Sequence, residues 1–263
     1  MPFFRALAFL SILPLGRATG FESRHVAGML AAFPYAGALL GALTGLFWHG
    51  VLQVFDPGLA AALTVGAWAL LTRFFHLDGV ADCADGLWGG YVAQRRLEIM
   101  KDPHIGTFGV VAVVILLLLK FSALQALAAW NWEDPRTTLY WRVAGGALVL
   151  GAGRWSMYLV ILRAVYARAS GGLGRDFVEA GGSKHVLHLG FSGGSLLMLL
   201  AAGAGFLPAL AVLPAVLMTG VFLRVVFSRA LGGVTGDVMG AAVEVGEIAA
   251  LLALAVCMKF RGV

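Results

Sequence analysis

The sequence is short of charge. Asp, Glu, Lys and Arg make up 13% of its 263 residues, about half the fraction found in a soluble domain. Hydrophobic residues make up 60%, and the mean hydropathy is +0.88. So few charges cannot cover a water-exposed surface, which excludes a soluble globular protein. We predict an all-α, polytopic integral membrane protein in which residues 1–263 form one membrane-embedded domain.

Cysteine is scarcer still. The chain has two cysteines, Cys83 and Cys257, which lie far apart and indicate neither a disulfide framework nor a zinc site. The net charge of +5 does not indicate nucleic-acid binding, because membrane proteins collect Lys and Arg in their cytoplasmic loops. We therefore expect a lipid bilayer and no nucleic acid as partner, and the sequence leaves oligomer formation open.

Long apolar runs predict about seven transmembrane helices. A spanning helix needs about 20 apolar residues, and the runs that meet this need, or come close to it, are 26–54, 59–75, 105–130, 143–162, 185–205, 206–226 and 239–258. Residues 1–16 are apolar but too short to span the bilayer. We predict that they form an interfacial helix lying on the membrane surface.

The distribution of Lys and Arg predicts the orientation. With the N-terminus inside, most of these residues fall in the inside segments, and the polar loop predicted at 131–142 lies outside. The acidic stretch therefore faces the cytoplasm, and the location we predict is the cytoplasmic (inner) membrane. Three polar segments, 76–106, 163–184 and 224–237, then share the cytoplasmic face, where we predict the active site.

An acidic cluster is the strongest local signal. Asp78, Asp82 and Asp85 are spaced i, i+4 and i+7, so a helix places them on one face. Like charges so close repel one another, and Mg²⁺ between them relieves the repulsion because it prefers carboxylate oxygens. The alternative is a solvated acidic helix face. We favour the metal site because the chain has 14 acids and places three of them within eight residues. His76 lies on a different face and ranks below the aspartates.

Two further segments carry functional candidates. Arg168 and Arg175 flank a glycine-rich stretch and are suited to binding phosphate oxygens, although for this segment taken alone a flexible loop with topological arginines is the better explanation. In the segment 232–247, Asp237, Glu244 and Glu247 fall on one helical face. Asp237 alone would be explained as a helix cap.

Two cations lie within predicted spans and call for a partner. Lys120 and Arg154 either pair with Glu244 and Glu247, a structural role, or bind a phosphate. The sequence leaves these two readings open.

Several motifs resemble the cobalamin synthase family, the adenosylcobinamide-GDP ribazoletransferases. They cover nearly the whole chain in the order His76–Gly86, Arg96–Asp102, Ile105–Gly109, Lys120 with Phe121, Arg168 with Gly172-Leu173-Gly174, and Gly233–Asp237 followed by Gly240, Ala241 and Glu244. Cys83 and Val80 are small departures from the family pattern. The resemblance implies a Mg²⁺-dependent membrane enzyme that joins α-ribazole, or its 5′-phosphate, to adenosylcobinamide-GDP and releases GMP.

The predicted roles follow from this resemblance and from the residues. Asp78, Asp82 and Asp85 are the predicted metal ligands, with Asp102 as a further candidate. Asp237 is a ligand or the base that takes the ribazole hydroxyl proton. Lys101, Arg168 and Arg175 are expected to hold phosphates, so the predicted catalytic residues are Asp237, Asp102 and Lys101.

Two rival functions remain as alternatives. The spaced aspartates also resemble those of CDP-alcohol phosphotransferases, phospholipid enzymes that run the same displacement, although the full spacing of that motif is absent. A secondary transporter is the rival of a different class. It would place ionisable residues near the midplane in broken helices related by a repeat, whereas most acids here lie at predicted cytoplasmic ends.

Overall fold

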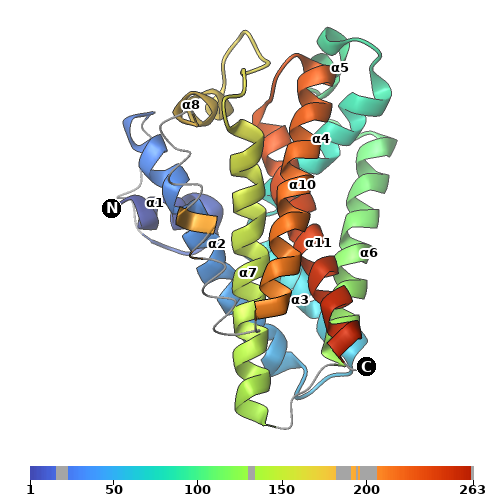
Figure 1. Ribbon diagram of the computed structural model, residues 1–263. Coiled ribbons are helices and arrows are strands. Elements are labelled where there is room, and N and C mark those ends of the chain that lie inside the picture. The colour runs from blue at the N-terminus through green and yellow to red at the C-terminus, as the bar shows by residue number, and fades with distance from the viewer. Residues whose placement is uncertain (16–22, 130–133, 182–190, 194, 196–205, 262–263) are drawn as a thin grey trace.

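The computed structural model describes residues 1–15, 23–129, 134–181, 191–193, 195 and 206–261, and its regular elements are helices. They are α1 (Pro2–Leu10), α2 (Ser23–Val51), α3 (Pro57–Leu71), α4 (Phe75–Gly89), α5 (Ala93–Ile99), α6 (Thr107–Ala128), α7 (Pro135–Ile161), α8 (Leu173–Ala180), α10 (Phe206–Leu231) and α11 (Gly236–Arg261). The long helices form a bundle, and α4, α5 and α8 gather at one of its ends (Figure 1). The prediction of an all-α fold is confirmed.

Five helices, α2, α6, α7, α10 and α11, are long and apolar enough to cross a membrane. The pair α3 and α4 together would make one more span, but they meet at an angle of 92°. The chain is therefore a multi-pass membrane protein, as predicted. The predicted span 185–205 lies largely outside the described residues, so the count of seven stays a prediction.

The start of α7 corrects the sequence-based boundary. Residues 131–142 were predicted as a polar loop, but the helix begins at Pro135. The Asp134 side chain accepts hydrogen bonds from the backbone N–H groups of Arg136 and Thr137, and proline is favourable at the first helical position. The helix therefore begins two turns before the apolar run. Asp134 followed by Pro135 is the signal in the sequence that marks this start.

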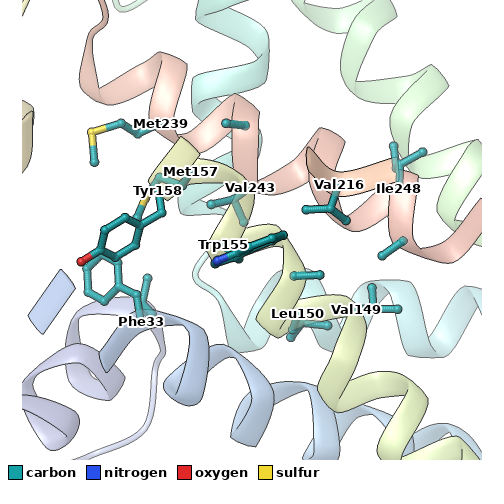
Figure 2. Close-up of a cluster of buried hydrophobic side chains, with 14 of the residues drawn as sticks. Phe33, Val149, Leu150, Trp155, Met157, Tyr158, Val216, Met239, Val243 and Ile248 are labelled. Atoms are coloured by element: carbon teal, nitrogen blue, oxygen red, sulfur yellow. The ribbon is translucent and has the colours of Figure 1, made fainter. Parts of the chain in front are cut away.

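Helix α7 is the centre of the bundle. In the most apolar stretch of α7, 94% of the residues are buried. The corresponding shares are 28% for α6 and 22% for α10, and such low burial is typical of lipid-facing helices. Val149, Leu150 and Trp155 of α7 lie among side chains of α10 and α11 (Figure 2). Helix α2 crosses α7 so closely that a Cβ at Gly41 would overlap the carbonyl oxygen of Gly146. Small residues permit such backbone contact in membranes.

A network of four charged side chains lies buried between α6, α7 and α11. The Lys120 ammonium donates to carboxylate oxygens of Glu244 and Glu247, at 2.7 Å each, and Arg154 pairs with Glu247. These side chains are at most 4% exposed. Two positive charges thus meet two negative charges. Of the two roles that the sequence left open for Lys120 and Arg154, the structure shows pairing with the glutamates.

We expect Lys120→Met to destabilise the protein. The change preserves apolar volume but leaves two carboxylates with a single cation, and breaking a buried ion pair by removing one partner costs about 3–5 kcal/mol. Thermal unfolding in detergent should show a lower Tm for Lys120→Met than for the wild type.

The matched control is the double variant Lys120→Met with Glu244→Gln. It returns the network to one cation and one anion, so its Tm should recover part of the loss. An unchanged Tm in Lys120→Met combined with lost turnover would instead support the phosphate-binding role.

Candidate active site

A sharp turn between α3 and α4 carries the acidic cluster across the end of the bundle. Arg73 and Phe74 both adopt left-handed backbone conformations, with φ values of 59° and 55°, which cost roughly 1–2 kcal/mol per residue. This turn produces the 92° bend. Helix α4 itself forms as predicted and includes Asp78, Asp82 and Asp85.

A glycine contact brings α4 against the start of α11. A Cβ at Gly79 would lie 2.5 Å from the backbone oxygen of Asp237, and Gly240 faces the same stretch of α4. The missing side chains let the two helices approach. The negative charges of Asp78 and Asp237 consequently act on Asp82 and on each other. Carboxylates far apart in the sequence thus form one acidic centre.

The glycine-rich segment reaches this centre through backbone pairing. The N–H of Ala167 donates to the carbonyl of Val234, and the N–H of Val234 donates to that of Val165, both at 2.9 Å. This pairing places Arg168 beside Asp237. The guanidinium donates to Oδ2 of Asp237 at 2.6 Å and to the carbonyl oxygen of Met100 at 3.2 Å. Arg168 therefore joins the three polar segments that were predicted to converge.

Asp237 does not cap its own helix through its side chain. The cap is Thr235, whose hydroxyl oxygen accepts the N–H of Val238 at 3.3 Å. The same hydroxyl donates to Oδ2 of Asp237 at 3.1 Å. The Asp237 side chain is 20% exposed, and its contacts with Arg168 and Thr235 both use Oδ2. These contacts orient the carboxylate and leave Oδ1 for a ligand.

Asp85 differs from the other two aspartates of α4. It is 8% exposed, and its two carboxylate oxygens accept the backbone N–H groups of Gly106 at 2.7 Å and Gly109 at 2.9 Å. Asp85 thus caps the N-terminus of α6, where a negative charge is favourable. The carboxylates of Asp78 and Asp82 make no hydrogen bond to other described residues.

The remaining predicted residues lie at the edge of the site. Lys101 donates to the hydroxyl of Ser170 at 3.2 Å. Asp102 is exposed and accepts the backbone N–H and a ring nitrogen of His104, which lowers the pKa of its carboxyl group. Arg175 forms an exposed ion pair with Glu179 at 3.1 Å. Among the described residues, no hydrogen bond or ion pair joins Lys101, Asp102 or Arg175 to Asp78, Asp82 or Asp237.

A cavity of about 200 Å³ adjoins the acidic centre. Asp78, Arg168 and Asp237 line its polar side. His76, which the sequence ranked below the aspartates, and Tyr166, which it did not indicate, line the cavity too. His76 received a low rank because it lies on another face of α4 from the aspartates, yet that face also borders the cavity. Tyr166 is an isolated tyrosine that no motif distinguishes.

The apolar side of the cavity comes from elements spread along the chain. Phe9 of α1, Phe33 of α2, Phe75 of α4 and Phe177 of α8 line it. The N-terminal segment is helical as predicted, and Ala6, Leu7 and Leu10 are buried, so α1 packs on α2 and forms part of the cavity wall. Its predicted contact with the membrane surface stays a prediction.

Comparison with known proteins gives one consistent family. The family model described as cobalamin-5-phosphate synthase matches residues 2–255. Relatives named adenosylcobinamide-GDP ribazoletransferase are 39% identical in Pseudomonas putida, over 97% of this chain and 98% of the relative, and 35% identical in Chlorobaculum tepidum, over 97% and 94%. A relative of the same name in Escherichia coli is 34% identical over 96% of this chain and 98% of its own. No solved structure matches the chain. The chain therefore belongs to the cobalamin-5-phosphate synthase family, as its motifs predicted.

Proposed function

We propose that this chain transfers adenosylcobinamide phosphate from adenosylcobinamide-GDP to α-ribazole, or to its 5′-phosphate, and releases GMP. The observation that carries the proposal is the acidic centre of Asp78, Asp82 and Asp237 with Arg168 beside it, on a cavity lined by the family's motifs. Transfer of a phosphoryl group from a diphosphate depends on positioning and charge neutralisation. The carboxylates can bind a cation and the guanidinium can bind phosphate oxygens, so together they supply both positioning and charge neutralisation.

Mg²⁺ fits the donor set at this centre. Among the described residues, no three or more His, Cys, Asp or Glu side chains form a ready-made metal cluster. Mg²⁺, however, is usually held by one or two carboxylates, water and substrate phosphates. Asp78 and Asp82 would hold the ion, whereas the carboxylate of Asp85 is already committed to α6. A bound Mg²⁺ would neutralise charge on the diphosphate.

The chain's own residues supply the other elements of the reaction. A ribazole hydroxyl oxygen attacks the phosphorus next to the corrinoid arm, forming a new P–O bond. The P–O bond to GMP breaks, and GMP leaves with the electron pair. Asp237, oriented by Arg168 and Thr235, accepts the hydroxyl proton at Oδ1. The Arg168 guanidinium stabilises the negative charge that develops on the phosphate oxygens.

The site would face the cytoplasm, with the chain in the inner membrane. The segments that form it carry most of the chain's Lys and Arg outside the spans, and such residues stay on the cytoplasmic side.

The test of the function is GMP release by purified protein from adenosylcobinamide-GDP and α-ribazole, with Mg²⁺ and with a chelator. Turnover that requires both substrates and Mg²⁺ is the expected result. Release of CMP from a CDP-alcohol, with no GMP from adenosylcobinamide-GDP, would contradict the proposal.

We expect Asp82→Asn and Asp85→Asn to fail in different ways. Asp82→Asn should lose more than about 10²-fold in turnover at a nearly unchanged Tm, because its carboxylate serves the ion and not the fold. Asp85→Asn should also lower the Tm, because the amide replaces one of the two oxygens that accept N–H groups from α6, leaving a buried donor without a partner. Turnover across a Mg²⁺ titration and thermal unfolding measure the two effects. Near-normal turnover in Asp82→Asn would remove it from the proposed metal site.

We expect Asp237→Asn to separate activity from stability. Asparagine keeps the size of the side chain but cannot accept the proton, and a general base contributes about 10²–10⁴-fold to the rate. Turnover should fall by that factor at a nearly unchanged Tm. Glu244→Gln is the control, since it weakens the Lys120 network and should lower the Tm. An active Asp237→Asn beside a stable but inactive Glu244→Gln would place the base two turns further along α11.

We expect the two ends of α7 to lie on opposite sides of the membrane. Ser170→Cys beside the site and Arg136→Cys at the start of α7 both replace exposed residues. A membrane-impermeant maleimide should label Arg136→Cys in intact spheroplasts and Ser170→Cys only in inverted vesicles. Labelling of both from one side would contradict the predicted topology.

A further inference from the structure

We propose that the aromatic side of the cavity is the binding site for the flat heteroaromatic base of the acceptor nucleoside. This assignment rests on the proposed function and adds to it the place where α-ribazole lies. Four phenylalanines form the apolar side of the cavity, which we call the aromatic wall: Phe9, Phe33, Phe75 and Phe177.

The aromatic wall is assembled from four helices that are distant in sequence. The rings of Phe9 and Phe33 are nearly parallel at 5.8 Å between centroids, and Phe9 meets Phe75 edge to face at 5.4 Å. Phe177 lies 5.5 Å from both Phe9 and Phe33. These are the distances and orientations at which aromatic rings attract one another. A flat base that enters the cavity can stack on these rings or pack edge to face against them in the same way.

The space beside these rings is larger than a packed core leaves empty. Protein interiors hold few voids larger than a water molecule, and apolar walls do not retain water well. Phe33 and Phe177 are 1% and 2% exposed, whereas Phe75 is 48% exposed. A half-exposed ring on the wall of a cavity of about 200 Å³ leaves apolar surface that a ligand ring would cover.

The chemistry of the wall favours the ribazole base over guanine. Its side chains offer no hydrogen-bonding group, and Met157 and Met239, both labelled in Figure 2, also line the cavity and extend its apolar lining. Guanine carries a carbonyl, a ring N–H and an amino group, each of which costs free energy when it is buried without a partner. A dimethylbenzimidazole base carries methyl groups and a single unsubstituted ring nitrogen, so the apolar wall suits it.

His76 supplies a second, independent observation. Its side chain lines the cavity and is buried, and Nδ1 has no hydrogen-bond partner among the described residues. A buried polar atom without a partner is unusual in a folded protein. The unsubstituted ring nitrogen of the base is an acceptor of the kind that an imidazole N–H requires. With the base on the aromatic wall, the ribose would extend toward Asp237 on the polar side of the same cavity.

The test is steady-state kinetics on two leucine variants of the wall. Phe75→Leu and Phe9→Leu remove a ring but keep an apolar side chain. We expect each to raise the KM for α-ribazole by about 3- to 10-fold, the equivalent of one lost aromatic contact. The KM for adenosylcobinamide-GDP should stay within about twofold. Phe47→Leu is the matched control, because Phe47 is 42% exposed and does not line the cavity, and it should leave both KM values unchanged.

Calorimetric titration of α-ribazole into the purified protein without donor separates this inference from the proposed function. Tight binding to the wild type and weaker binding to Phe75→Leu would support the site even if no GMP were released. Equal affinity of the two proteins, or no binding to either, would overturn it. A rise in the KM for adenosylcobinamide-GDP alone would also overturn it and would assign the wall to guanine.

Discussion

The buried pairing of Lys120 and Arg154 with Glu244 and Glu247 is the constraint on which the arrangement of this protein depends. In the membrane interior a lone charge is costly, so these four residues must meet, and α6, α7 and α11 must pack together. Glu244 follows Asp237 by two turns of the same helix and lies on the same face. Fixing Glu244 against Lys120 therefore also fixes the direction in which Asp237 presents its carboxylate, roughly 10 Å away along the axis.

Close helix contacts complete the site around that carboxylate. Gly79 allows α4 to lie directly against Asp237, and the backbone pairing of residues 165–167 with Val234 delivers Arg168 to the same point. The left-handed turn at Arg73 and Phe74 orients α4 across the end of the bundle. Local backbone strain there is offset by tertiary contacts. The result is an acidic centre whose members come from separate segments and are held by the helices behind them.

The cavity has two chemically different sides. The polar side gathers carboxylates and a guanidinium, which suit a cation and phosphate oxygens. The aromatic side is apolar and suits a flat base. The proposed transfer would use both sides, because the attacking hydroxyl must be held near the phosphorus. Helix α1, an apolar segment with no charged motif beyond Arg5, takes part in this division through Phe9.

The sequence by itself determined the membrane-embedded helical fold, the helical face of the acidic cluster and the family, because hydropathy, spacing and motifs are local properties of a chain. It also predicted that the three polar segments converge. Only the tertiary structure decided which aspartate does what: Asp82 stays with the acidic centre, and Asp85 turns to the backbone of α6. Spacing places both on one helix face but does not show what packs against each of them. The same reason explains why the roles of Thr235, Tyr166 and the aromatic wall were not predicted and why His76 ranked below the aspartates. Their roles arise from neighbours that lie far away in the sequence, and the folded chain alone brings them together.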